Sequence, residues 1–293
     1  MAQSSQELRS RIKSVNSTRK ITKAMEMIAN AKLLKQRYKM ESNREYAQRL
    51  QDTCDEIVAK NPGVESRFTK PVHGTKKMTI IFCSDLGLCG GYNSGVMKFA
   101  RENLNPADPC FLIGTSLTRQ LKEEGFNLIN EEPMSSDRAT FLSIKDAVRT
   151  GVDLYERGEI SSLQLLYTRF VNTMTFKPDI DVLLPCDITP DEEVRMKARE
   201  EKADSDGMYI ETLFEPDPET ILNRLIPMMI DNVAFADWME STTAEQGSRR
   251  VAMKTATDNA DELSQSLQLE YNKVRQASIT QEITEIVGGS AAV

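Results

Sequence analysis

The sequence predicts an α/β protein with two long helices: N- and C-terminal helices form an antiparallel coiled coil that projects from a central, mostly parallel, Rossmann-like α/β domain. Residues 1–61 contain neither glycine nor proline, and residues 219–287 contain only Pro227 and Gly247. Between these stretches, short apolar runs alternate with helical patterns, as in a sheet covered by helices. We expect three parts: a first helix at 1–62, an α/β domain at 75–215 and a last helix at 216–293.

The first helix is expected to begin near residue 4. Ser4 and Glu7 have the spacing of a capping box, in which two side chains satisfy backbone N–H groups of the first turn. Leu8, Ile12 and Val15 follow at helical spacing. Because no helix breaker precedes residue 62, the pattern predicts one helix of more than fifty residues.

The last helix has a clear start. Asp217 is a suitable N-cap, and Pro218 suits the first helical position. Pro227 should kink this helix rather than end it. The chain closes on small, uncharged residues from Ile286 to Val293. Apolar residues recur every three or four positions along the later part and form a stripe: Ala256, Ala260, Leu263, Leu267, Tyr271 and Val274.

The lengths of the two helices predict how they pack. At 1.5 Å per residue they are roughly 80 and 100 Å long, whereas a compact chain of this size has a diameter of about 50 Å. Both helices must extend beyond the α/β domain, and they most simply pack on each other. Their seam is poor, so we expect a rod that other subunits enclose. Its two columns in the first helix are Leu8, Val15, Thr22, Ala29 and Gln36, and Ile12, Arg19, Glu26, Leu33 and Met40.

The central stretch predicts strands that alternate with helices. Apolar runs at 78–83, 110–114 and 163–167 are expected to be strands, with a final strand at 209–214. The strongly charged segment 191–206 is expected to be an exposed helical or mobile connector. Helical patterns occupy 93–103, 115–124 and 141–157.

Charge is unevenly distributed along the chain. Residues 1–50 contain 12 Lys and Arg against 4 Asp and Glu, although the whole chain has a net charge of −7. A basic helix is compatible with a solvated face, with a docking surface for an acidic partner, or with nucleic-acid binding. Nucleic acid ranks last, because only Tyr38 and Tyr46 could stack on bases in this stretch.

Few residues could support catalysis or metal binding. His73 is the only histidine, which excludes most histidine-based hydrolase and zinc sites. The five cysteines are scattered and odd in number, as expected of reduced, buried thiols. No apolar run approaches the ~18 residues of a membrane span, and no signal or transit peptide is recognisable. These features favour a bacterial cytoplasmic chain.

A glycine-rich segment, Ser84 to Asn93, follows the first predicted strand. This is where α/β folds bind phosphates, but its glycines do not form GxGxxG and no lysine completes a P-loop. A tight loop is the more economical interpretation. Cys83 and Cys89 lack the second pair of a zinc site. Asp85 is better interpreted as a helix-proximal or loop-fixing carboxylate than as half of an acid/base pair.

Five segments carry a resemblance to a known family. They are Ser17–Met27 in the first helix, Ser84–Asn93, Phe214–Pro218, and the C-terminal runs Ala252–Asn259 and Tyr271–Gly289. The sequence closely resembles the gamma subunits of F-type ATP synthases. The resemblance implies a central-stalk rotor subunit that couples proton flow through the membrane c-ring to ATP synthesis or hydrolysis at the alpha/beta sites, with no catalytic site, cofactor or metal of its own.

The resemblance also implies partners and contact residues. The coiled coil should lie inside the ring of alpha and beta subunits, and the α/β domain should be a foot on the epsilon subunit and the c-ring. One copy per complex is expected, at the cytoplasmic face of the bacterial inner membrane. Implied ring contacts are Lys20, Lys23, Met25, Arg275, Gln276, Thr280 and Glu282. Implied foot contacts with the c-ring or epsilon are Gly87, Gly90, Phe214 and Glu215.

Two departures limit the transfer from the family. Leu86 stands where many members carry a charged or polar residue, so an ionic contact is not expected there. Cys186 stands alone, whereas chloroplast members carry an inserted cysteine pair, so thiol switching is not predicted. Two other function classes compete with this one. An adapter with a helical hairpin would not need a basic first helix. A Rossmann-type enzyme would not explain why the chain has two long helices.

Overall fold

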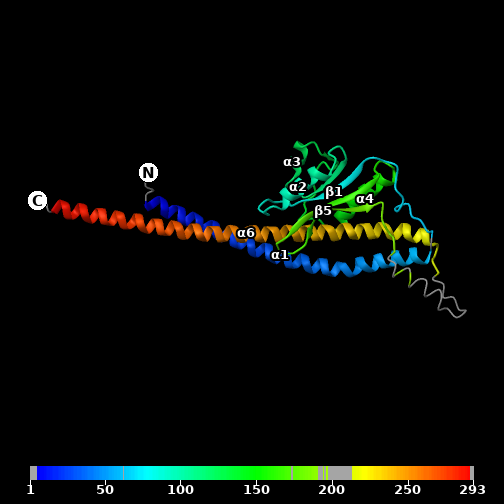
Figure 1. The fold of residues 1–293 in the computed structure, drawn as a ribbon, viewed down its shortest axis with the longest axis horizontal. Coiled ribbons are helices and arrows are strands. Elements are labelled where there is room, and N and C mark those ends of the chain that lie inside the picture. Colours follow the sequence, from blue (N-terminus) through cyan, green and yellow to red (C-terminus); the bar gives the residue numbers. More distant parts are fainter. Residues whose placement is uncertain are drawn as a thin grey trace. The chain divides into compact units, whose positions relative to one another are not determined.

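The computed structural model describes residues 5–61, 63–172, 174–190, 194, 196 and 213–290. The chain divides into two compact units. Unit 1 comprises Met1–Ala31 and Arg249–Val293, and unit 2 comprises Lys32–Ser248. Two long helices, labelled in Figure 1, each contribute residues to both units: α1 spans Ser5–Lys60 and α6 spans Pro218–Ser290.

The observed starts of the long helices agree with the predicted starts, as far as the described residues allow the comparison. Asp217 caps α6, because its carboxylate accepts hydrogen bonds from the backbone N–H of Thr220 (2.8 Å) and from the Thr220 hydroxyl (2.7 Å). Pro218 is the first helical residue, and α6 continues through Pro227. Glu7 lies in the first turn of α1, whereas its predicted capping partner Ser4 lies outside the described residues.

Unit 1 contains an antiparallel helix pair, α1 residues 5–31 with α6 residues 249–290. Contacts that advance along α1 retreat along α6: the Ser264 hydroxyl donates to Asn16 Oδ1 (3.1 Å), and the Thr257 hydroxyl donates to the Thr22 hydroxyl (2.8 Å). Polar layers separate the buried apolar ones, as the weak heptad columns predict. The buried apolar residues of this unit are Leu8, Ala29, Met253, Ala260 and Leu267.

Unit 2 is built on a five-stranded sheet in the order β3-β2-β1-β4-β5. The strands β3, β2, β1 and β4 are parallel, and β5 pairs with β4 in antiparallel fashion. This confirms a mostly parallel sheet with covering helices. The strands are β1 Lys77–Phe82, β2 Pro109–Ile113, β3 Asn127–Leu128, β4 Ser162–Phe170 and β5 Phe176–Leu184; the helices are α2 Tyr92–Asn103, α3 Thr118–Glu123 and α4 Phe141–Glu156.

Strand β5 was not expected from the sequence. Its segment contains Pro178 and two aspartates, which are depleted in strands. Pro178 is tolerated because β5 is an edge strand with only one neighbour in the ladder. The strand expected at 209–214 falls largely outside the described residues, and Leu213 and Phe214 lie in no strand. Of the expected connector at 191–206, only residues 194 and 196 are described, and both are helical.

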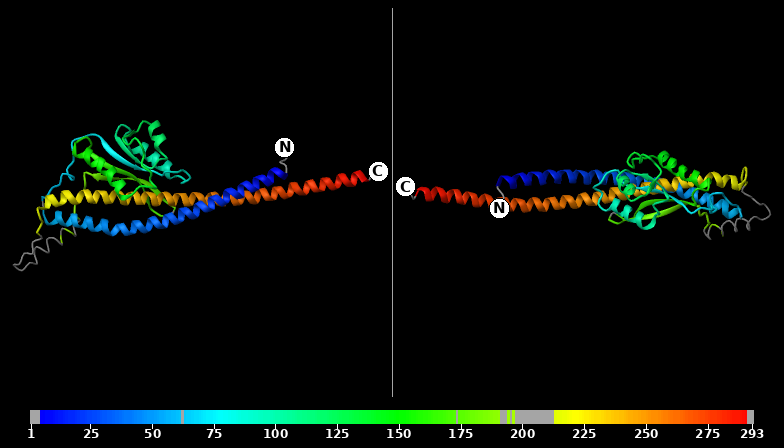
Figure 2. Two further views of the ribbon diagram at one scale, coloured as in Figure 1. Left: turned by 180° about the vertical axis from the view of Figure 1, so that it is seen from behind. Right: turned by 90° about the horizontal axis from the view of Figure 1, so that it is seen from above.

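The sheet of unit 2 has two buried faces. Met78, Ile80 and Phe82 of β1 pack in one cluster with α4, α1 and α6, while Ile81 packs in a second cluster with α2 and α3. Because side chains alternate along a strand, one six-residue segment serves both cores. Both ribbon views show α6 passing along the sheet in this unit (Figures 1 and 2).

The part of α6 in unit 2 is buried on most of its circumference, yet it carries many polar residues. Hydrogen bonds satisfy several of them: the Ser241 hydroxyl bonds to the Tyr92 hydroxyl (2.8 Å) and accepts from the Thr168 backbone N–H (3.2 Å). The Glu240 carboxylate accepts from the Phe170 backbone N–H (2.8 Å). These bonds fix α6 to β4 and to the start of α2.

Candidate partner-binding surfaces

Two of the sequence-predicted ring contacts, Lys20 and Lys23, lie on α1 in unit 1 but differ in their surroundings. The Lys23 ammonium forms an ion pair with Glu26 of the same helix at 2.9 Å. Lys20 is exposed and lines a hollow between α1 and α6. The structure therefore leaves the charge of Lys20 more available to a partner than the charge of Lys23.

Methionine 25 presents less surface than its neighbours on α1. Met25 is half-buried, whereas Ile21, Met27 and Ile28 expose about 60% of their surface (61%, 59% and 58%). Soluble proteins rarely leave several large apolar side chains together in water without a partner. Sequence reasoning missed these three residues, although their clustering outside the heptad columns was visible in the sequence.

The predicted contacts near the end of α6 are all exposed. The Arg275 guanidinium lies over the Tyr271 ring, 6.0 Å from its centroid, and the Thr280 hydroxyl donates to the Gln276 carbonyl (2.9 Å). Glu282 is exposed on the same stretch. An apolar stripe at steps of three and four accompanies them, with exposed side chains at Ile279, Ile283, Ile286 and Val287.

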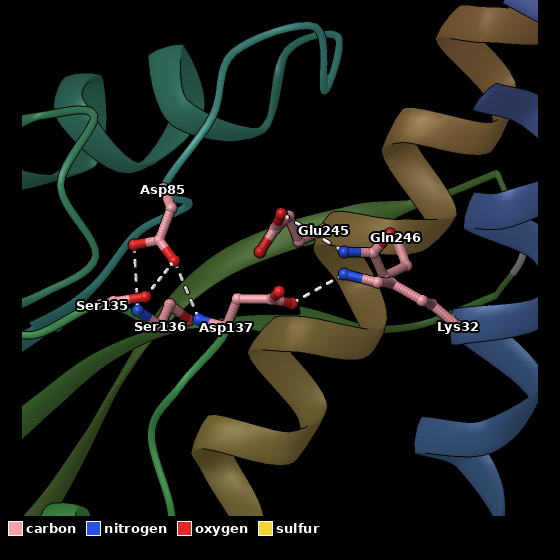
Figure 3. Close-up of polar contacts among 7 residues, drawn as sticks. All are labelled: Lys32, Asp85, Ser135, Ser136, Asp137, Glu245 and Gln246. Carbon is pink, nitrogen blue, oxygen red and sulfur yellow. Dashed lines mark hydrogen bonds and ion pairs between the residues drawn. The ribbon is translucent and has the colours of Figure 1, made fainter.

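The glycine-rich loop of unit 2 is fixed by Asp85. Its carboxylate accepts hydrogen bonds from the Ser135 hydroxyl (2.7 Å) and from the backbone N–H groups of Ser136 and Asp137 (2.9 Å each). Asp137 in turn forms an ion pair with Lys32 of α1 at 2.8 Å. Figure 3 shows these groups facing one another, which confirms the interpretation of Asp85 as a loop-fixing carboxylate.

The tip of the same loop is apolar and tightly turned. Leu86 and Leu88 expose 74% and 66% of their surface. Leu88 and Gly90 both have positive φ angles, of 61° and 60°. Nothing lies within 4 Å of a Cβ added to Gly87. The two leucines are exposed together with the predicted Gly87 and Gly90, and they add apolar surface to this loop.

Phe214 and Glu215, the other predicted foot contacts, precede α6. The Phe214 side chain is half-buried against the core cluster that contains α4 and α6, so part of its surface is already used within the chain. Glu215 is exposed. Only the acidic residue and the outer part of the ring remain open to a partner.

The five cysteine side chains are buried, and the structure gives them no reactive character. Burial raises the pKa of the Cys54 thiol to about 11 and the pKa values of the Cys83, Cys110 and Cys186 thiols to about 12. Thiols with such pKa values are protonated and inert at neutral pH. Within the described ranges, no group of three His, Cys, Asp or Glu residues has the arrangement of a metal site.

Comparisons with known proteins cover nearly the whole chain. The family profile described as ATP synthase matches residues 4–293. An ATP synthase gamma chain from Alkaliphilus metalliredigens is 38% identical over 290 residues, covering 98% of each chain. The chain belongs to the ATP synthase gamma chain family. Another member, the sodium ion specific gamma chain of Acetobacterium woodii, is 36% identical over 301 residues and covers 100% of both chains.

Solved structures share the fold of this gamma-family chain. The rotor of the Euglena gracilis mitochondrial ATP synthase matches with a TM-score of 0.62 at 16% identity, over 94% of this chain and 98% of that chain. The central stalk and c-ring structure from Tetrahymena thermophila matches with a TM-score of 0.55 at 20% identity, over 80% and 99%. Long terminal helices around a central mixed sheet are therefore common to all three.

Membership of the gamma family confirms the rotor-subunit function expected from the resemblance. A gamma chain is a non-catalytic rotor subunit of ATP synthase, so the competing enzyme and adapter classes no longer apply. No helix among the described residues is long and apolar enough to cross a membrane. The individual contact residues stay predictions.

Proposed function

We propose that this gamma-family chain is the central-stalk rotor that couples ion flow through a membrane c-ring to ATP turnover in a ring of alpha and beta subunits. The structural support for this proposal comes from unit 1. Its helix pair leaves large apolar side chains exposed on both helices, among them Ile21, Met27, Ile28, Ile283 and Ile286. A helix pair with this much uncovered apolar surface needs an enclosing partner.

Further partners follow from the same family. We infer one copy per complex, an epsilon subunit and the c-ring at the foot, and a position at the cytoplasmic face of a bacterial inner membrane. We infer that residues 75–215 form the foot, with the exposed Leu86, Leu88 and Glu215 as candidate contacts. Proton coupling stays a prediction, since a sodium-specific member is about as similar as the others.

The rotor acts by contacting each catalytic site differently. A ligand shifts a conformational equilibrium only when it interacts more strongly with one state than with the other. Driving a site from mostly open to mostly closed requires about 5.5 kcal/mol of differential interaction. The basic groups of α1 supply charged contacts, and the apolar stripes of α6 supply apolar contacts. Both sets of contacts change partners as the helix pair turns inside the ring.

Co-expression with the organism's own alpha and beta subunits tests the proposal. The expected product on size-exclusion chromatography contains three alpha, three beta and one copy of this chain, and it hydrolyses ATP faster than alpha and beta without the chain. A chain that elutes alone as a stable monomer, and whose presence leaves ATPase activity unchanged, would contradict the proposed function.

A further inference from the structure

Four carboxyl side chains lie close together where α6 packs against β4 and β5 in unit 2. Asp179 and Asp181 come from β5, and Asp237 and Glu240 come from α6. We call these four side chains the carboxyl cluster. Arg169 of β4 lies beside them and pairs with Asp179 at 3.1 Å. With all of these groups ionised, negative charge would exceed positive charge in a partly buried place, which disfavours the charged form of at least one carboxyl.

Asp237 differs from another buried carboxyl on the same helix. Asp231 and Asp237 are each 8% exposed. Asp231 pairs with Lys145 of α4 at 2.9 Å. Asp237 takes part in none of the ion pairs of the described residues, and no donor among them reaches its buried Oδ2 atom. A buried carboxylate without a cation is costly, so Asp237 has a strong tendency to hold a proton instead.

The position of that proton follows from a contact between two carboxyl groups. The Asp237 carboxyl is in hydrogen-bonding contact with the Asp181 carboxyl. Ionised carboxylates only accept hydrogen bonds, so this contact requires a proton on one of the two groups. Burial raises the pKa of Asp237 well above its ordinary value, whereas Asp181 is only half-buried. Asp237 therefore carries the proton and Asp181 accepts it, which joins α6 to the edge strand β5.

We propose that Asp237 and Asp181 share one proton, and that this proton fastens the edge strand β5 to α6 as a pH-sensitive clasp. Below the pKa of the pair the clasp is closed. As pH rises through that pKa the proton leaves, two negative charges face each other, and β5 loosens from α6. Because all the groups involved lie in unit 2, the clasp does not depend on the proposed rotor function.

The other groups around Asp237 do not replace it as the holder of this proton. Burial raises the pKa of Tyr167 on β4 to about 12, and burial raises the pKa of the Cys186 thiol beyond the end of β5 to about 12, so both stay neutral. Burial also raises the pKa of Glu240, but Glu240 already accepts a backbone N–H of β4 at 2.8 Å, which favours its ionised form. Arg169 favours the ionised form of Asp237 and so limits the pH to which the clasp stays closed.

Infrared spectroscopy of the full chain tests for the proton itself, because a protonated carboxyl has a carbonyl band that a carboxylate lacks. The difference spectrum between wild type and Asp237→Asn should contain this band at about pH 5, where carboxyls of ordinary pKa are mostly ionised, and should lose it toward about pH 9. Glu240→Gln is the matched variant and should keep the band. A difference spectrum without the band, or a band that Glu240→Gln removes instead, would overturn the proposal.

Hydrogen exchange of the full chain tests whether the proton holds β5. Protection factors correct for the effect of pH on the chemical exchange rate, and those of β5 should fall by about tenfold for each pH unit above the pKa of the pair. Strand β1, at the centre of the same sheet, should keep its protection. In Asp237→Asn the amide donates to Asp181 at every pH, so the pH dependence should disappear. Protection of β5 that is independent of pH in wild type, or equally dependent in Asp237→Asn, would contradict the clasp.

Two neighbouring substitutions should move the midpoint of this pH-dependent change in opposite directions. Asp181→Asn removes a negative charge that raises the pKa of Asp237, so the midpoint should fall; Arg169→Gln removes a positive charge that lowers this pKa, so the midpoint should rise. Each shift should be about one pH unit. Asp153→Asn, on the exposed side of α4, should leave the midpoint unchanged. Loss of protection in both variants without these opposite shifts would show a merely structural role and overturn the proposal.

Discussion

Asp237 places a carboxyl group inside unit 2, on the part of α6 that the sheet covers. Its side chain is 8% exposed, and its Oδ2 atom has no hydrogen-bond partner. Burial raises the pKa of this carboxyl well above its ordinary value, and the charges of Asp181 on β5 and Glu240 on α6 raise it further, whereas Arg169 on β4 lowers it. The ionised form of Asp237 is therefore costly in the folded state.

Asp237→Asn should stabilise the chain at neutral pH. The folded state holds the Asp237 proton more tightly than the unfolded state, whose aspartate pKa is about 3.9. The carboxyl therefore favours folding below that pH, and this contribution is lost as pH rises through the folded-state pKa. Urea unfolding at pH 5 and pH 8 should show a gain of roughly 1 to 3 kcal/mol at pH 8 and a smaller gain at pH 5.

A substitution on the exposed side of α4, Asp153→Asn, is the matched control for Asp237→Asn. It should change the unfolding free energy by less than about 0.5 kcal/mol at either pH. A stability loss in Asp237→Asn at pH 8, or a gain that does not depend on pH, would show that the charge of the buried Asp237 carboxylate does not destabilise the folded state.

Lys20 and Lys23 were predicted as a pair, but the structure distinguishes them. Lys20→Glu reverses a charge that has no partner among the described residues, whereas Lys23→Glu removes an ion pair that is already satisfied within α1. In membrane vesicles that carry the whole synthase, Lys20→Glu should lower ATP-driven ion pumping relative to ATP hydrolysis. Lys23→Glu should leave that ratio closer to wild type, and the opposite order would contradict the argument.

At the scale of elements, Gly114 fixes the end of β2. Its φ angle is +106°, and an added Cβ would lie 2.1 Å from the Cys83 carbonyl oxygen, at the end of β1. A side chain here would be strained and would also push two parallel strands apart. The same backbone position allows the Gly114 N–H to donate to the Met134 carbonyl (2.7 Å), which leads the chain toward the turn that Asp85 fixes.

Gly114→Ala should destabilise unit 2 by about 3 kcal/mol or more. Gly125→Ala is its control, because Gly125 also has a positive φ of +81° but nothing within 4 Å of an added Cβ. The control should cost about 1 to 2 kcal/mol from backbone strain alone. Trp238, the single tryptophan and a buried residue of unit 2, reports unfolding in urea. Equal losses of unfolding free energy in Gly114→Ala and Gly125→Ala would rule out a steric clash between the added Cβ and Cys83.

Local signals explain which elements the sequence could predict. The absence of Gly and Pro marked α1, and the Asp217-Pro218 pair marked the start of α6, because both depend on neighbouring residues only. Strand β5 was missed since its Pro178 is tolerated only at a sheet edge, and an edge is a property of the assembled sheet. The polar face of α6 could likewise not be assigned to the interior without its hydrogen-bond partners on β4 and α2.

The candidate site was likewise only partly predictable from the sequence. The family motifs gave a set of contact residues that stays a prediction, and the structure shows that these side chains differ in exposure and pairing. Lys23 is neutralised by Glu26, Met25 is half-buried, and Leu86 and Leu88 are more exposed than the glycines beside them. Such differences arise from packing and pairing in three dimensions, which spacing along the chain does not encode.

At the scale of the whole molecule, the two units differ in how their surfaces are covered. Apolar clusters pack around the sheet of unit 2, whereas the helix pair of unit 1 alternates apolar and polar layers. In the isolated chain, hydrogen exchange should be faster in α1 residues 5–31 and α6 residues 249–290 than in β1 and β4. Binding to the ring should protect those helix segments; exchange that is unchanged on assembly would contradict their enclosure.

The central claim, that this chain rotates inside an alpha/beta ring, is best tested by watching a single complex. Arg119→Cys introduces one reactive thiol on α3, where the side chain is 90% exposed, while the native cysteines are buried. A bead attached there, on a ring fixed to glass, should turn in one direction when ATP is added and pause at three positions per turn. Continuous ATP hydrolysis by the same complexes without directed rotation of the bead would contradict the account.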